Sequence, residues 1–130
     1  MKIVADTSVI IAVLTNAIHK PAIIAKTQYA DLIAPLSLHW EIGNAFSPMF
    51  KRDRITLEQA LEALSSYNEI PIRFVDVDLQ HSIALSKQFN MYAYDIYFIV
   101  CAQKENAALL TLDKKLVQVA CELGIKTLEV

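Results

Sequence analysis

The sequence predicts an α/β fold, a three-layer α/β/α sandwich whose central sheet is parallel and has about five strands. Two observations carry this prediction. Short apolar runs recur along the whole chain, and stretches of helical length with apolar periodicity separate them. That alternation is typical of parallel strands joined by right-handed helical crossovers. At 130 residues the chain is long enough to bury one core, so we expect a single domain over residues 1–130.

The expected strands are short apolar runs bounded by turn or helix signals. They cover residues 3–5, 31–34, 72–75, 108–111 and 126–128. Pro35 ends the second of them, because proline has no N–H to contribute to a sheet. The expected helices lie between the strands, at residues 7–14, 21–29, 37–52, 79–89, 96–105 and 113–123, with one more beginning at Leu57.

Local signals indicate where several of these helices begin and end. Thr56 and Gln59 have the spacing of a capping box at the start of the helix that opens with Leu57. Gly124 favours a stop after the helix at 113–123. Pro48 is expected to kink or interrupt the helix at 37–52, because it lacks an N–H and its ring clashes with the preceding turn.

The composition limits the classes of function. The net charge of −2 and the pI near 5.9 do not suggest a strongly basic nucleic-acid binder, although they leave a nucleic-acid enzyme open. With two glycines, the chain has no glycine-rich phosphate loop. No apolar run reaches the roughly 18 residues of a membrane span. Asp6 interrupts any signal-peptide core, so we expect a cytoplasmic protein with no membrane partner.

Four carboxylates interrupt or flank apolar stretches: Asp6, Glu41, Asp95 and Asp113. An acid beside buried surface costs free energy unless something compensates it, and a shared cation would compensate several at once. Hard oxygen ligands suit Mg²⁺ or Mn²⁺. The histidines and cysteines show no zinc-ligand spacing. The sequence therefore predicts a metal site of the kind that hydrolyses phosphodiesters.

Each acid also has a simpler interpretation. Asp6, Asp95 and Asp113 each precede an expected helix and could be N-caps, a role that leaves one carboxylate oxygen free for a metal. Glu41 could be a surface residue of an amphipathic helix. The pair Lys114–Lys115 is interpreted as a solvated helix end, with phosphate contacts as the alternative.

Nearby polar residues could support the acids. Ser8 and Thr7 follow Asp6, and Asn44 lies one helical turn after Glu41, where both side chains can share a face. Thr111 precedes Asp113 by two residues. Each could orient a carboxylate or hold a metal-bound water, or could bond only to the local backbone.

Four segments occur in a characteristic order: VADTSVI at 4–10, WEIGNA at 40–45, YDIYFIVCA at 94–102 and LTLDKKL at 110–116. In this order the sequence resembles the PIN domain family, and within it the VapC-type toxins of prokaryotic toxin–antitoxin pairs. The resemblance implies a Mg²⁺- or Mn²⁺-dependent endoribonuclease in which Asp6, Glu41, Asp95 and Asp113 form the acidic quartet. It also implies that Asn44 and Thr111 support the quartet, that the protein is a homodimer, and that a cognate antitoxin inhibits it.

Two other classes remain to be weighed. A receiver-like signalling domain would need an adjacent acidic pair after its first strand and a lysine ending its last strand. Here Asp6 stands alone and Lys126 begins its strand. A catalytically inactive PIN-like interaction module is the second alternative, and the presence of all four acids argues against it.

Overall fold

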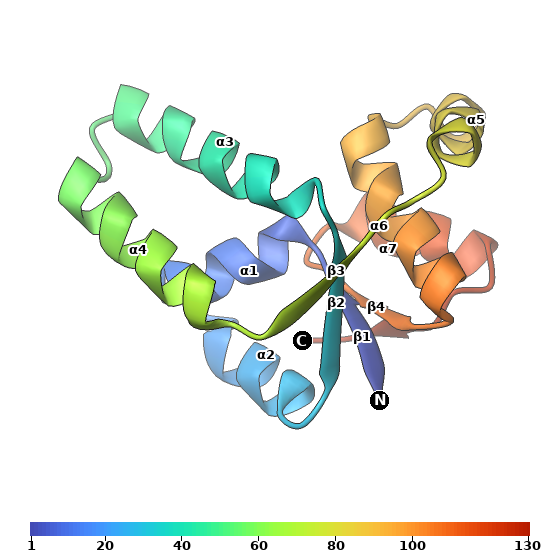
Figure 1. The fold of residues 1–130 in the computed structure, drawn as a ribbon, viewed down its shortest axis with the longest axis horizontal. Coiled ribbons are helices and arrows are strands. Elements are labelled where there is room, and N and C mark those ends of the chain that lie inside the picture. Colours follow the sequence, from blue (N-terminus) through green and yellow to red (C-terminus); the bar gives the residue numbers. More distant parts are fainter.

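Five parallel strands form one central sheet in the computed structural model, which describes residues 1–130 (Figure 1). The strands are β1 (Lys2–Ala5), β2 (Asp31–Pro35), β3 (Ile72–Val75), β4 (Ala108–Leu110) and β5 (Thr127–Leu128). Their order across the sheet is β3-β2-β1-β4-β5, and every neighbouring pair is parallel. The predicted fold class is therefore confirmed.

Seven helices cover the two faces of this sheet. They are α1 (Thr7–Leu14), α2 (Lys20–Thr27), α3 (Leu38–Lys51), α4 (Leu57–Glu69), α5 (Leu79–Phe89), α6 (Ala93–Glu105) and α7 (Lys114–Glu122). The chain steps from β1 through β2 to β3, then returns to β4 and β5 on the other side of β1. Because right-handed crossovers fix the side of each connection, α1 to α4 lie on one face and α5 to α7 on the other (Figure 1).

The core lies where α6 crosses the sheet. This helix packs against β1, β2 and β4, and six of its residues are buried, among them Ile96, Ile99 and Cys101. On the sheet, Ile3 and Leu109 are fully buried. Both cysteines are free thiols. No helix is long and apolar enough to cross a membrane. The well-packed β1, β4 and α6 give the residues at their ends a rigid support.

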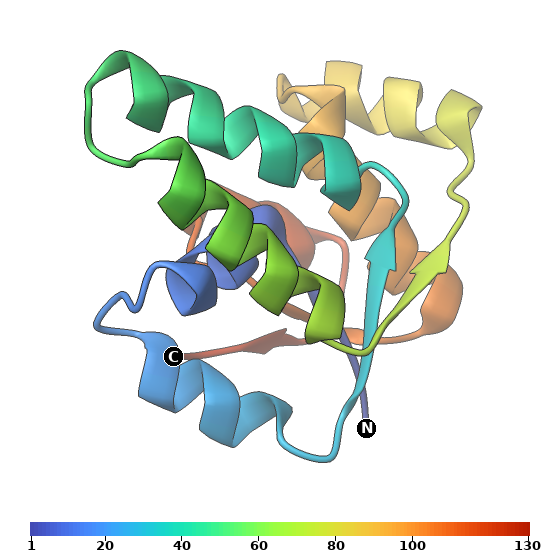
Figure 2. The same cartoon turned by 60° about the vertical axis from the view of Figure 1, so that its left-hand side comes forward.

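The helix at residues 38–51 corrects one expectation. α3 continues through Pro48 as a single α-helix, so the expected interruption there is absent. Proline removes only one N–H donor, and the turn after it is restored because the Arg52 N–H donates to the Pro48 carbonyl at 3.1 Å. α3 and α4 form an antiparallel pair that extends beyond the sheet (Figure 2).

The start of α6 is a second correction. This helix begins at Ala93 with Tyr92 as its N-cap, so Asp95 lies inside the first turn and is not the cap. The Asp95 N–H donates to the Tyr92 carbonyl at 3.2 Å, which closes a turn before the apolar run begins. The capping box at the start of α4 is confirmed, because Gln59 N–H donates to Thr56 Oγ1 at 3.1 Å and Thr56 N–H donates to Gln59 Oε1 at 2.9 Å.

Candidate acidic site

The candidate site lies at the carboxyl ends of β1 and β4. After β1 the chain passes to one face of the sheet, and after β4 it passes to the other, so the switch point of the sheet lies between these two strand ends. Ligands of open parallel sheets bind at such a switch point. Asp6 directly follows β1, and Thr111 and Asp113 follow β4. The Asp6 N–H donates to the Leu110 carbonyl at 3.2 Å, which joins the two strand ends.

Asp6 is held at both carboxylate oxygens. It is only 5% exposed and caps α1, with Oδ1 accepting from Val9 N–H at 3.1 Å and from Ser8 Oγ at 2.6 Å. Oδ2 accepts from Thr111 Oγ1. Asp6 is therefore an N-cap, as the simpler interpretation held. A carboxylate has about four lone-pair positions, so these bonds leave acceptor capacity unused.

The two hydroxyl groups are themselves fixed by backbone amides. Ser8 Oγ accepts from the Leu112 N–H at 3.0 Å, and Thr111 Oγ1 accepts from the Asp113 N–H at 3.0 Å. Because each hydroxyl oxygen accepts from an N–H, its own hydrogen is directed at Asp6. Ser8 and Thr111 therefore orient the Asp6 carboxylate, as the sequence suggested.

Asp113 caps α7 with one oxygen. Its Oδ1 accepts from the N–H groups of Lys115 at 2.9 Å and Leu116 at 3.4 Å. Oδ2 makes no hydrogen bond. The predicted cap is confirmed, and the second oxygen is left for another partner.

Glu41 and Asp95 come from helices on opposite faces of the sheet, and the two carboxylates lie near enough for the Asp95 charge to raise the Glu41 pKa. Glu41 lies in the first turn of α3, which starts just after β2, and Asp95 lies in the first turn of α6. Ser37 Oγ donates to Glu41 Oε2 at 3.5 Å. Glu41 is half-buried, which makes it more than a surface residue of an amphipathic helix.

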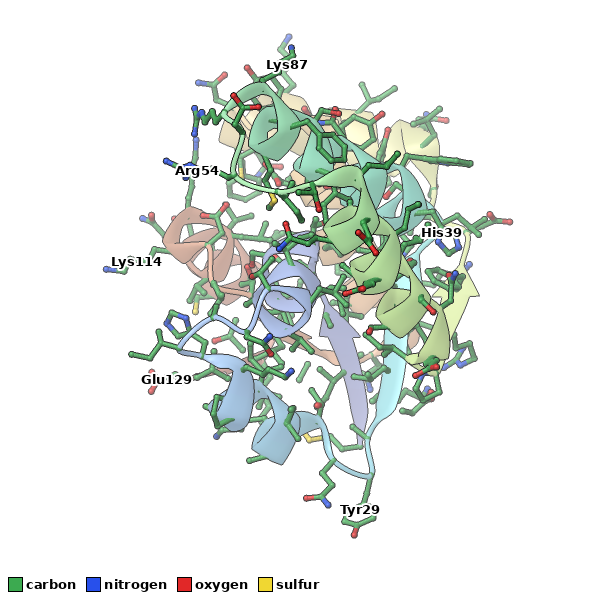
Figure 3. All side chains as sticks on the ribbon, turned by 90° about the vertical axis from the view of Figure 1, so that its left-hand side faces the viewer. Tyr29, His39, Arg54, Lys87, Lys114 and Glu129 are labelled. Atoms are coloured by element: carbon green, nitrogen blue, oxygen red, sulfur yellow. The ribbon has the colours of Figure 1, made fainter.

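Two neighbouring clefts contain these acids. One is lined by Thr7, Trp40, Glu41, Asn44, Ala45 and Tyr94. The other is lined by Asn90, Met91, Tyr92, Asp95, Asp113 and Lys115. Lys115 thus faces the acids, and its Nζ donates to the Asn90 carbonyl at 3.4 Å. Lys114 instead points outward from α7 (Figure 3).

The acids act on one another electrostatically. Burial raises the pKa of Asp6, against the effect of the Ser8, Thr111 and Val9 hydrogen bonds, and the Asp113 charge raises it further. Burial raises the pKa of Glu41 to about 7, and the charges of Asp95 and Asp6 add to the shift.

Asp95 is the third acid of the site with a raised pKa. Burial raises its pKa and the charge of Asp113 raises it again, while Lys115 lowers it. The Asp113 charge thus acts on Asp6 and Asp95, and the charges of Asp6 and Asp95 act on Glu41. These four acids are hereafter called the acid ring.

The acid ring does not form a closed ligand cage. No three acidic, histidine or cysteine side chains converge on one point where an ion could be held. Repulsion between carboxylates favours such separation. Mg²⁺ is commonly bound through one or two carboxylates with several waters retained, so it does not require a cage of three.

The residues present fit a hard divalent cation. The four acids supply carboxylate oxygens, which Mg²⁺ and Mn²⁺ prefer as ligands. Three of the four carboxyl groups have a raised pKa, which a nearby positive charge would relieve. The buried Thr7 hydroxyl beside Glu41 has no hydrogen-bond partner of normal geometry. It is nevertheless near enough to lower the Glu41 pKa.

The sequence profile of the PIN domain matches residues 3–121. The chain belongs to the PIN domain family. The resemblance drawn from the four sequence segments is thus confirmed, and a receiver domain is excluded. No curated protein sequence matches the chain.

Several solved structures share this fold. VapBC2 from Rickettsia felis, bound to a DNA fragment from its promoter, matches with a TM-score of 0.70 and 12% identity over 98% of each chain. VapBC-1 from nontypeable Haemophilus influenzae gives 0.66 and 21%, covering 99% of this chain and 98% of the other. Mycobacterium tuberculosis VapC20, a Sarcin-Ricin loop cleaving toxin, gives 0.62 and 11%, covering 89% and 93%. At sequence identities this low, the structural matches establish the shared fold alone.

Sequence reasoning did not select several residues that line the clefts. Trp40 and Tyr94 flank Glu41 and Asn44, and Asn90 lies beside Asp95. Trp40 and Tyr94 each directly precede an acid of the ring in the sequence. An aromatic residue directly before a candidate acid is the sequence signal that could have identified Trp40 and Tyr94 as residues near the site.

Proposed function

We propose that the protein is a metal-dependent endoribonuclease that hydrolyses RNA phosphodiester bonds, and that it is the toxin of a toxin–antitoxin pair. The observation that carries the proposal is the acid ring at the switch point of a PIN-domain fold. VapC20, which has the same fold, is a Sarcin-Ricin loop cleaving toxin, and this supports RNA as the substrate.

Different side chains are proposed to bind the cation and to orient its ligands. Asp6 and Asp95 are proposed as the direct ligands of Mg²⁺ or Mn²⁺. Glu41 and Asp113 are proposed to complete the cluster, to bind a second ion or to position the attacking water. When bound, the cation supplies charge to polarise a phosphoryl oxygen and lower the pKa of water. Ser8 and Thr111 keep the Asp6 carboxylate oriented.

Glu41 is proposed to accept a proton from the attacking water. Burial raises its pKa to about 7 without a cation, and a bound cation favours the carboxylate form, which is the form that accepts a proton. Asn44 lies in the same cleft and can hold that water or the substrate. Water as the nucleophile makes no use of the ribose 2′-hydroxyl, so single-stranded DNA is the chemical competitor to be tested.

The partner proposal rests on exposed apolar residues and on the fold neighbours. Leu57, Leu61 and Leu64 are exposed on α4, and Phe50 is exposed at the end of α3. The R. felis and H. influenzae structures are of VapBC proteins. We propose a homodimer that also binds a cognate antitoxin. The molar mass of the purified protein, alone and with the product of the neighbouring gene, tests both; a strict monomer at high concentration contradicts the dimer.

RNA cleavage by the purified protein tests the enzymatic proposal. With Mg²⁺ or Mn²⁺ we expect cleavage that stops on adding a chelator. Asp6→Asn and Asp95→Asn should each lower the rate at least about 100-fold, since even supporting groups of metal sites contribute 10- to 100-fold.

Asp53→Asn is the matched control for these variants. It also neutralises one carboxylate, but Asp53 is exposed beyond α3 and has a φ of 52° that asparagine tolerates. Full activity in both site variants, or cleavage that survives the chelator, would refute the assignment. Binding of RNA without any cleavage by the wild type would support the inactive interaction module instead.

A further inference from the structure

Two exposed aromatic rings stand over the cleft that contains Glu41. Trp40 comes from α3 and is 73% exposed, and Tyr94 comes from α6 and is 54% exposed. Both line the same cleft of about 500 Å³, together with Thr7, Asn44 and Glu41. The two helices lie on opposite faces of the sheet (Figure 1), so the cleft brings together side chains from both faces.

Each of the two exposed rings lies edge-on to a neighbouring ring. Tyr94 packs edge-on against Tyr97, with ring centroids 5.8 Å apart and an interplanar angle of 88°. Trp40 lies edge-on to His39, with centroids 6.4 Å apart. His39 is fixed in turn by the Tyr67 hydroxyl, which is 2.7 Å from Nδ1. Rings that are positioned before binding lose little conformational freedom when a ligand stacks on them.

We propose that Trp40 and Tyr94 form a stacking subsite for an unpaired nucleobase beside the scissile phosphate. This inference rests on the proposed nuclease function and names residues that select the substrate. Every nucleobase has a flat π-face that stacks on aromatic side chains. Asn44 adds a side-chain amide in the same cleft, which can donate to and accept from the edge of the stacked base.

Stacking adds affinity to the attraction between the proposed cation and the phosphate backbone. The net charge of the chain is −2, and the four acids proposed to hold the cation account for four of its negative charges. Lys115 is the basic residue lining the adjoining cleft, beside Asp95 and Asp113. Contacts to bases therefore add to the binding free energy that phosphate contacts supply.

The same geometry selects unpaired nucleic acid over other ligands. In a duplex each base face is covered by its neighbours, so a ring cannot stack on it without unstacking the helix. A protein partner that covered the rings would also bury Glu41 and Asn44, and burying polar groups without partners costs free energy. The bound segment is therefore a single strand or a loop.

Trp40 is the only tryptophan of the chain, so its fluorescence reports directly on the subsite. All proteins in the test carry Asp6→Asn, which keeps the RNA intact in the presence of Mg²⁺. A short single-stranded RNA should quench the Trp40 emission, and the same sequence annealed as a duplex should not. Tyr94→Ala should raise the Kd of the single strand between about 5-fold and about 100-fold, whereas Tyr94→Phe should leave it nearly unchanged.

Tyr29→Ala is the matched control. Tyr29 is 95% exposed and lies at the lower tip of the molecule, away from His39 (Figure 3). Its removal should leave the Kd unchanged. For Trp40→Ala and Trp40→Phe, binding is followed by the anisotropy of labelled RNA, with a loss expected for alanine and rescue by phenylalanine.

The outcomes separate this inference from the proposed function. Quenching by the single strand without cleavage by the wild type supports the subsite and refutes the nuclease. Cleavage by the wild type, with RNA binding that leaves Trp40 emission unchanged, refutes the subsite and retains the nuclease. Equal quenching by the duplex overturns the selection of unpaired bases. Unchanged RNA affinity in Trp40→Ala, with lost affinity for a protein partner, overturns the assignment to a nucleobase.

Discussion

Replacing Thr111 by valine removes a hydroxyl group that donates to Asp6 of the acid ring and preserves the shape of a buried side chain. In the wild type, Thr111 Oγ1 donates to Asp6 Oδ2 and accepts from the Asp113 N–H. A hydrogen bond to a charged group contributes about 1.5–3 kcal/mol to stability, and one to a neutral group about 0.5–1.5 kcal/mol. We therefore expect Thr111→Val to lower the free energy of unfolding by about 1.5–3 kcal/mol where Asp6 is ionised.

The pH dependence of this loss follows from the Asp6 pKa. Burial raises this pKa above its ordinary value of 3.8, and the Thr111 hydrogen bond lowers it. A raised pKa in the folded state gives stability that is present below 3.8 and is lost as the pH rises through the folded-state pKa. Without Thr111 the pKa is higher still, so the variant loses more. The difference between wild type and variant should widen with rising pH.

Urea unfolding at about pH 4 and about pH 8 measures this difference. The gap should shrink toward about 0.5–1.5 kcal/mol at the lower pH, where a protonated Asp6 needs the donor less. Thr15→Val is the matched control, since its exposed hydroxyl donates to the neutral Ile11 carbonyl at 2.8 Å. A gap that is equal at both pH values, or larger at the lower one, would refute the account of Asp6.

Two further predictions concern single side chains. Burial raises the pKa of Glu41 to about 7, so the stability linked to its protonation is present below its ordinary value of 4.5 and lost as the pH rises through about 7. Glu41→Gln should therefore gain stability over the wild type above neutral pH, and thermal unfolding across that range checks it; a gain confined to acid pH would contradict the sign. Thr56→Ala breaks the capping box of α4 and should cost about 1 kcal/mol, with no change at the acid ring. Unfolding by urea measures that loss, and an unchanged midpoint would show that the cap contributes nothing.

Much of the fold could be predicted because the local signals agree with the packing. β3, α1 and α5 have the bounds that their apolar runs and flanking residues indicated. Asp6 and Asp113 cap helices because each follows a strand and precedes a helical pattern. The helix at 37–52 was predicted, but its continuation through Pro48 without interruption was not, since packing of the apolar stripe around Phe46 outweighs one missing hydrogen bond.

The candidate site was predicted as a set of residue types, and its geometry was not. The start of α6 depends on Tyr92 and Ala93, which carry no strong capping signal, so Asp95 was placed at a cap. The approach of Trp40 and Tyr94 depends on where α3 and α6 begin relative to the sheet. The sequence alone does not give the distance between the starts of two helices that lie on opposite faces of a sheet.

Calorimetric titration with Mn²⁺ tests most directly the central claim, which is that the acid ring is one cation site. The wild type should bind the ion, and Asp6→Asn or Asp95→Asn should weaken binding at least about 10-fold, while Asp53→Asn should not. A cation also displaces protons from carboxyl groups with a raised pKa. Since burial raises the pKa of Glu41 to about 7, binding at neutral pH should release protons, seen as a heat that varies with the buffer. No binding by the wild type, or equal binding by all four proteins, would contradict the account.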